Sequence, residues 1–270
     1  MTINSADGSI VVSAEEGEGA LILIVHGGMS DEKPWAMVAA ELARDFHVVR
    51  IRRRLYRLEL PADPATDFAR EVEDLAALTA TFGTPCVIVG HSSGAVVALE
   101  ALVAHPEAYA GAVLYEPPVV LDGPLGTPTT LARARTALAA GKPGAALRIF
   151  LAEAVQVSAF LAFVAGASTR FAADLKKFVP RQIDDMDAID QLGRRVEAYG
   201  AIQTPTVFLS GANSPAHLGE RTRALAAVMP HATITTMPGQ GHGAHTQDPA
   251  LVARLIAEHA HAVGLGETGS

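Results

Sequence analysis

The sequence contains a single cysteine, Cys86, and this scarcity excludes an internal disulfide. Cys86 opens the apolar run Cys-Val-Ile-Val, which predicts a buried thiol in a strand. Uncharged stretches fall short of the roughly 18 apolar residues of a membrane span, so we expect no membrane segment. The first ten residues, MTINSADGSI, carry no Lys or Arg and no apolar signal-peptide core, so we expect a cytoplasmic protein.

Basic residues are scarce relative to acidic ones. Lys and Arg total 21 against 29 Asp and Glu, which gives a formal net charge of −8. Because phosphate contacts need a basic surface, this imbalance predicts that nucleic acid is not a partner. The 270 residues, 49% hydrophobic and 19% charged, are sufficient for one large α/β domain with an insertion.

Short apolar runs alternate along the chain with helical patterns. The expected strands are 21–25, 47–51, 86–89, 112–115 and 206–210, with a weaker sixth at 233–237. The helical patterns cover 35–44, 67–82, 94–105, 220–229 and 249–263. This alternation predicts an α/β fold, in which a mostly parallel central sheet carries helices on both faces.

The alternation breaks between residues 122 and 200. This stretch predicts helices at 130–140, 144–157 and 171–178, with prolines at 124, 128, 143 and 180 as breaks. We therefore expect an all-helical cap at 122–200, inserted into a core formed by 1–121 and 201–270. Five phenylalanines predict either an apolar underside of this cap or the cap's own core: Phe150, Phe160, Phe163, Phe171 and Phe178.

Residues 87–100, VIVGHSSGAVVALE, run from an apolar strand through a Gly-x-Ser-x-Gly turn into a helix. This context is typical of a nucleophile elbow, in which small flanking residues allow a strained turn that lifts one serine above the sheet edge. The following helix N-terminus also favours a developing oxyanion. Ser92 is therefore the candidate nucleophile, with a helix-capping role as the alternative.

Several segments together resemble the α/β-hydrolase family, over nearly the whole chain. They are Val25-His26-Gly27-Gly28-Met29, Trp35, Gly90-His91-Ser92-Ser93-Gly94, Leu114-Tyr115-Glu116-Pro117-Pro118 and Met237-Pro238-Gly239-Gln240-Gly241-His242. The resemblance implies an α/β-hydrolase fold with a cap over the pocket and a cofactor-free site. It also implies that the oxyanion hole is formed by the backbone N–H groups of Ser93 and Gly28, or of Met29 in place of Gly28.

A serine hydroxyl needs a base to take its proton, and imidazole titrates in the right range. His242 matches the family's late histidine and is the candidate base. His245 lies three residues later, but because no third ligand stands in a supporting motif, we expect no metal. His26 and His91 resemble positions that orient turns in relatives, and we expect them to be structural.

The residue that would complete a catalytic triad with Ser92 and His242 is an acid, and here the chain departs from the usual family pattern. Relatives commonly place an Asp in the turn after the strand at 206–210, but this chain reads Ser-Gly-Ala-Asn-Ser there. The histidine still needs an acceptor at its other nitrogen. Glu116 ends the preceding strand, where some relatives carry their acid, and it keeps the order nucleophile, acid, base. The alternatives are Asn213 or Ser214 as a neutral partner, with Glu116 capping a turn.

Five arginines crowd the segment 50–57, RIRRRLYR. We interpret them as a solvated loop paired with nearby acids, and an anionic substrate group or a partner protein is the alternative.

These residues together predict a cofactor-free serine hydrolase of a carboxylic ester, lactone or thioester. Its partner would be a small-molecule substrate with an apolar acyl or lactone group. One alternative is a non-hydrolytic enzyme on the same fold, such as a haloperoxidase-like enzyme, a lyase or a cyclase. Another is a catalytically silent ligand-binding protein. Assembly as a homodimer is left open.

Overall fold

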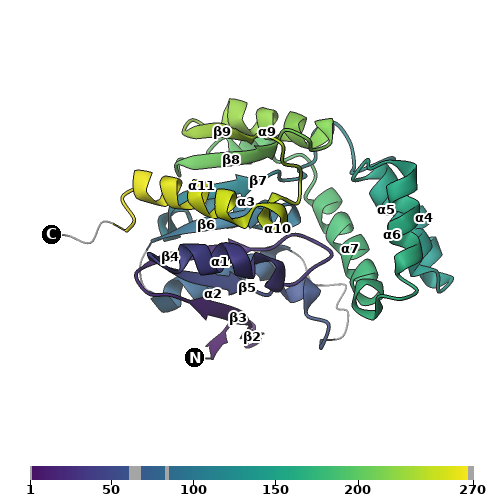
Figure 1. The fold of residues 1–270 in the computed structure, drawn as a ribbon, viewed down its shortest axis with the longest axis horizontal. Helices are drawn as coiled ribbons and strands as arrows, with labels where there is room; N and C mark the ends of the chain where they lie inside the picture. The colour runs from purple at the N-terminus through teal and green to yellow at the C-terminus, as the bar shows by residue number, and fades with distance from the viewer. Residues whose placement is uncertain (1, 61–67, 83–84, 267–270) are drawn as a thin grey trace.

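The protein is described by a computed structural model that covers residues 2–60, 68–82 and 85–266. Within them, a seven-stranded sheet has the order β3-β5-β4-β6-β7-β8-β9 (Figure 1). Its strands are β3 (Ser13–Glu16), β4 (Ala20–Val25), β5 (Phe46–Ile51), β6 (Cys86–His91), β7 (Tyr109–Tyr115), β8 (Thr206–Gly211) and β9 (Ala232–Met237). Every neighbouring pair is parallel except β3 with β5, which confirms the predicted sheet.

The N-terminal strands were not predicted from the sequence. They are β3 and a small separate pair, β1 (Ile3–Asn4) with β2 (Ile10–Val11). The residues of β3, Ser-Ala-Glu-Glu, contain no apolar run, because this antiparallel edge strand is not covered on both faces as the central strands are.

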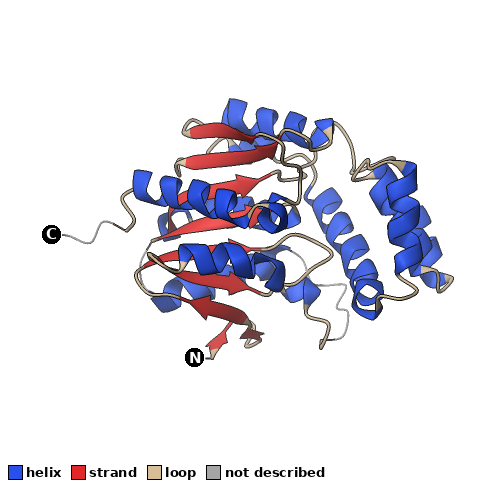
Figure 2. Cartoon of the chain, viewed as in Figure 1, coloured by secondary structure: helices blue, strands red, loops and turns tan. Residues whose placement is uncertain are grey.

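Helices cover both faces of the sheet, as predicted (Figure 2). On one face lie α1 (Ala36–Leu42) and α11 (Pro249–Ala262), and on the other lie α2 (Phe68–Phe82), α3 (Ser93–Ala104) and α9 (Ala216–Val228). Each face of the sheet has its own hydrophobic core, and strand β4 contributes to both of them. Ile22 and Ile24 pack with α1 and α11, while Leu23 packs with α2 and α3. Asp67, the predicted first residue of α2, lies outside the described residues.

Four of the five described α-helices between β7 and β8 gather at one end of the sheet, on the right in Figure 1; the fifth, α8 (Val196–Tyr199), leads into β8. The four are α4 (Thr130–Ala139), α5 (Pro143–Glu153), α6 (Ala159–Ser168) and α7 (Ala173–Leu192). They share a small core of Ala134, Ala146, Leu147, Val179 and Ile183. In the described parts of the chain, no helix is both long and apolar enough to cross a membrane.

Two predictions for this segment were wrong. The break at Pro180 is absent, because α7 continues through this proline as one helix. The carbonyl of Lys176, which a proline four residues later leaves without its helical partner, belongs to an exposed residue, so water can satisfy it. The predicted packing also fails for Phe160, Phe163 and Phe171, which are 74%, 58% and 92% exposed on the outer surface.

Candidate active site

Ser92 occupies a sharp corner between β6 and α3. Its φ of 52° and ψ of −127° are strained for a residue with a side chain, as in a nucleophile elbow. Both flanking glycines are sterically required. A Cβ on Gly90 would lie 2.5 Å from the Cα of Ala95, and one on Gly94 would overlap the carbonyl oxygen of His26. The turn therefore depends on the small residues of Gly-His-Ser-Ser-Gly.

His242 lies in the loop that follows β9, and two buried aromatic residues fix this loop. His91 Nε2 donates to the His242 carbonyl oxygen at 3.0 Å, and the Tyr115 hydroxyl donates to the Gly241 carbonyl. Burial, together with the neighbouring His242 and His245, lowers the pKa of His91 well below its ordinary value. His91 is therefore a neutral donor that positions the loop.

Glu116 follows β7 directly, with a φ of 47° and a fully buried side chain. Its Oε2 lies 2.6 Å from Nδ1 of His242. Its Oε1 accepts hydrogen bonds from the Gly211 backbone N–H at 2.8 Å and the Ser210 hydroxyl at 3.4 Å. Since a carboxylate accepts, Nδ1–H is the donor in this contact, and Nε2 is the ring nitrogen left to take a proton.

The two neutral alternatives to Glu116 are placed differently. Asn213 Nδ2 donates to the Gly239 carbonyl at 3.0 Å. The Ser214 hydroxyl is buried and has no hydrogen-bond partner among the described residues. Glu116, rather than either of them, is thus the residue that contacts His242 Nδ1.

Ser92 and His242 line one cavity of about 210 Å³, together with Gly28, Met29 and Ser93. The walls are mostly apolar, and helices α5 and α7 contribute to them. They include Phe150 and Leu151 of α5, Met186 and Ile189 of α7, and Leu125. The structure therefore brings all the predicted site residues together at one apolar cavity, with Glu116 behind His242.

The candidate oxyanion donors lie on both sides of the corner serine. Ser93 is the first residue of α3, so its backbone N–H lacks an intrahelical partner. Gly28 lies against α7, since a Cβ on it would overlap the side-chain oxygen of Gln182. Met29 follows Gly28 with a φ of 57° and also lines the cavity.

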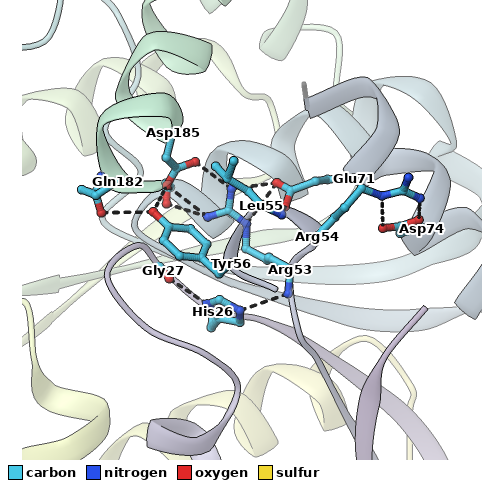
Figure 3. Close-up of polar contacts among 11 residues, drawn as sticks. His26, Gly27, Arg53, Arg54, Leu55, Tyr56, Glu71, Asp74, Gln182 and Asp185 are labelled. Atoms are coloured by element: carbon cyan, nitrogen blue, oxygen red, sulfur yellow. Dashed lines mark hydrogen bonds and ion pairs between the residues drawn. The ribbon is translucent and has the colours of Figure 1, made fainter. Parts of the chain in front are cut away.

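The arginine segment differs from the prediction in burial but not in pairing. Arg52 forms an ion pair with Glu32 at 2.6 Å, and Arg54 pairs with Asp74 (Figure 3). Arg53, however, is 1% exposed. A solvated loop is therefore wrong for Arg53, because its partners arrive from α2 and α7, which the local sequence cannot reveal. These contacts were missed at the sequence level.

Cys86 and His245 do not line the cavity that contains Ser92. Cys86 is buried in β6, and burial raises the pKa of its thiol to about 12, as expected for an inert core thiol. His245 stacks on Trp35, with ring centroids 4.9 Å apart. Residues 2–60, 68–82 and 85–266 contain no group of three or more His, Cys, Asp or Glu side chains placed to hold a metal ion.

The model of the Alpha/beta hydrolase family matches residues 22–255. "Uncharacterized hydrolase YraK" of Bacillus subtilis (strain 168) is 32% identical over 124 residues, which are 43% of this chain and only 46% of that relative. An alpha/beta hydrolase structure from Sphaerobacter thermophilus DSM 20745 has 27% identity and a TM-score of 0.82, over 96% of this chain and 99% of that one. Esterase RhEst1 from Rhodococcus sp. ECU1013 shares the fold, with 21% identity, a TM-score of 0.71 and coverage of 98% and 99%.

Proposed function

The chain belongs to the alpha/beta hydrolase family, and from this premise we propose that it is a serine hydrolase that cleaves a carboxylic ester, lactone or thioester through an acyl-enzyme on Ser92. One observation carries the proposal. The buried Glu116 carboxylate lies 2.6 Å from His242 Nδ1, and His242 lines the same cavity as the strained Ser92. This arrangement supplies an acid, a base and a nucleophile in the order that acyl transfer requires.

In the proposed reaction, Ser92 Oγ attacks the substrate carbonyl carbon and gives its proton to Nε2 of His242. The Glu116 carboxylate stabilises the imidazolium through the Nδ1–H bond. The carbonyl electron pair becomes an oxyanion, and collapse of this intermediate expels the leaving group, which takes the proton from His242. Water then attacks the acyl-enzyme, gives a proton to His242, and releases the carboxylic acid and free Ser92.

We assign the oxyanion hole to the backbone N–H groups of Gly28 and Ser93. Gly28 is preferred over Met29 because it is the position directly after the His-Gly turn. The N-terminal position of Ser93 in α3 adds the partial positive charge of the helix end.

The cavity supports an apolar acyl group of short to medium length. Its 210 Å³ equals the liquid volume of about seven water molecules. Phe150, Met186 and Ile189 present apolar side chains to it, so a buried acyl chain would gain up to about 0.8 kcal/mol per methylene.

Covalent labelling tests the nucleophile and the reaction class together. A fluorophosphonate should react with Ser92 Oγ, forming an O–P bond with loss of fluoride, and peptide mapping should place the label there. Turnover of p-nitrophenyl esters without added peroxide would separate hydrolysis from haloperoxidase-like chemistry. Label on Ser93 or Cys86, or retention of labelling in Ser92→Ala, would overturn the assignment.

A further inference from the structure

A buried arginine next to the candidate site satisfies all of its hydrogen-bond donors. Arg53 lies two residues after β5, and its guanidinium has five N–H donors. Nε and Nη2 donate to Glu71 at 3.1 and 2.7 Å, Nη2 and Nη1 donate to Asp185 at 2.8 and 3.3 Å, and Nη1 donates to Ser93 Oγ at 2.7 Å (Figure 3). With every donor engaged, the guanidinium has one orientation.

Arg53 is connected to both sides of the proposed oxyanion hole. Its side chain holds Ser93, and its backbone N–H donates to His26 Nε2 at 3.1 Å. Because Nε2 accepts this hydrogen bond, the ring proton of His26 is on Nδ1, which donates to the Gly27 carbonyl at 2.7 Å. The turn that carries Gly28 and the helix start that carries Ser93 are therefore fixed to the same residue.

The cap takes part in this network through α7. Asp185 is fully buried and accepts from Arg53 and, at 2.8 Å, from the Tyr56 hydroxyl. Tyr56 also contacts Gln182 Oε1 at 3.1 Å (Figure 3). The Gln182 side chain lies against Gly28, because a Cβ on Gly28 would overlap it. The cap is thus joined to the core by buried, charge-assisted hydrogen bonds next to the oxyanion hole.

Building on the proposed function, we propose that Arg53 and Asp185 are positioning residues that hold the Gly28 and Ser93 N–H groups in place and fasten α7 to them. Neither residue lines the cavity with Ser92, so neither touches the substrate. Their effect is on the placement of the donors. Because oxyanion donors must lie within hydrogen-bond distance of the developing charge, small displacements reduce transition-state binding more than substrate binding.

The charge state of the network is fixed by its neighbours. Burial alone would lower the pKa of Arg53, but the adjacent carboxylates of Asp185 and Glu71 raise it, so the guanidinium stays charged. Replacement of Asp185 by Asn leaves Arg53 with one buried carboxylate partner and puts an NH₂ donor opposite one of its N–H groups, which then has no acceptor. The contact with Ser93 then loses its fixed geometry.

Asp185→Asn tests the inference, with Asp74→Asn as the matched control. Asp74 also accepts a two-point ion pair from a neighbouring arginine, Arg54, and is buried at 4% exposure. We expect Asp185→Asn to lower kcat about 10- to 100-fold with little change in KM, while Asp74→Asn keeps both constants. Ser93→Ala, which retains the backbone N–H but removes the Arg53 acceptor, should lower kcat in the same way and serves if Asp185→Asn does not fold.

A matched pair of ketone inhibitors separates loss of donor positioning from a general loosening of the site. The trifluoromethyl ketone forms an adduct with Ser92 that carries an oxyanion, whereas the corresponding methyl ketone forms such an adduct only weakly. Relative to the wild-type protein, Asp185→Asn should bind the trifluoromethyl ketone more weakly, by the same factor as its kcat/KM falls. Its affinity for the methyl ketone should be unchanged. Equal losses for both ketones, or kinetics equal to those of Asp74→Asn, would overturn the inference alone. Failure of the wild-type protein to label with fluorophosphonate would overturn the proposed function and this inference with it.

Discussion

The Glu116 carboxylate lies 2.6 Å from Nδ1 of His242, although 126 residues separate them in the sequence. Glu116 leaves the end of β7, and its other oxygen accepts the Gly211 backbone N–H at the end of β8. The carboxylate is therefore held from both sides. In the proposed triad, Glu116 would take the role of the acid.

Replacement of this carboxylate should impair proton transfer without unfolding the protein. Glu116→Gln retains the shape of the side chain, but its amide NH₂ can favour the wrong tautomer of His242. We expect kcat for p-nitrophenyl esters to fall by up to roughly 10⁴-fold, the scale of triad-acid loss. Asn213→Ala is the control, since Asn213 donates to Gly239 rather than to His242. An unchanged kcat in Glu116→Gln would reduce the triad to a Ser92 and His242 dyad.

The elbow should tolerate no side chain at Gly94. In Gly94→Ala, the added Cβ would overlap the His26 carbonyl and force the turn apart. We expect a loss of about 1–3 kcal/mol in the free energy of unfolding and a strong fall in fluorophosphonate labelling. Gly123→Ala is the control, because a Cβ there has open space among the described residues. Equal stability of the two variants in urea titrations would count against the steric argument.

The sequence predicted the features that depend on local pattern. The elbow around Ser92, the six core strands and Glu116 at the end of a strand could all be found from short runs of residues. The partners of Arg53 could not, because Asp185 lies 132 residues away in the sequence, on α7, and meets Arg53 only in the tertiary structure. Tertiary packing also accounts for the length of α7, because the contacts of Val179 and Ile183 keep the helix intact around Pro180.

Stability should fall as the pH drops below neutrality, because His26 is buried and neutral. Burial, with the nearby Arg53 charge, lowers the pKa of His26 from 6.5 to about 4. The unfolded chain therefore binds the proton first, so this contribution is complete above pH 6.5 and is lost between about pH 6.5 and 4. The expected loss from His26 at pH 5 is about 2 kcal/mol. Urea unfolding at pH 7 and pH 5 measures it, and a smaller pH dependence is expected in His26→Asn. If the free energy of unfolding changed equally with pH in the wild-type protein and in His26→Asn, the effect would come from other groups.

The cap should set the length of the acyl group. Ala154 lines the cavity between the cap and Ser92, so Ala154→Leu would fill part of the 210 Å³ with a larger side chain. In the wild-type protein we expect kcat/KM to rise from the acetate to the butyrate ester, since each buried methylene contributes up to about 0.8 kcal/mol. It should then level off once the cavity is full. Ala154→Leu should move this optimum toward shorter esters, whereas Ala139→Leu on the exposed end of α4 should leave the profile unchanged. A profile that is flat from acetate to octanoate, or that shifts equally in both variants, would show that the acyl chain binds outside this cavity.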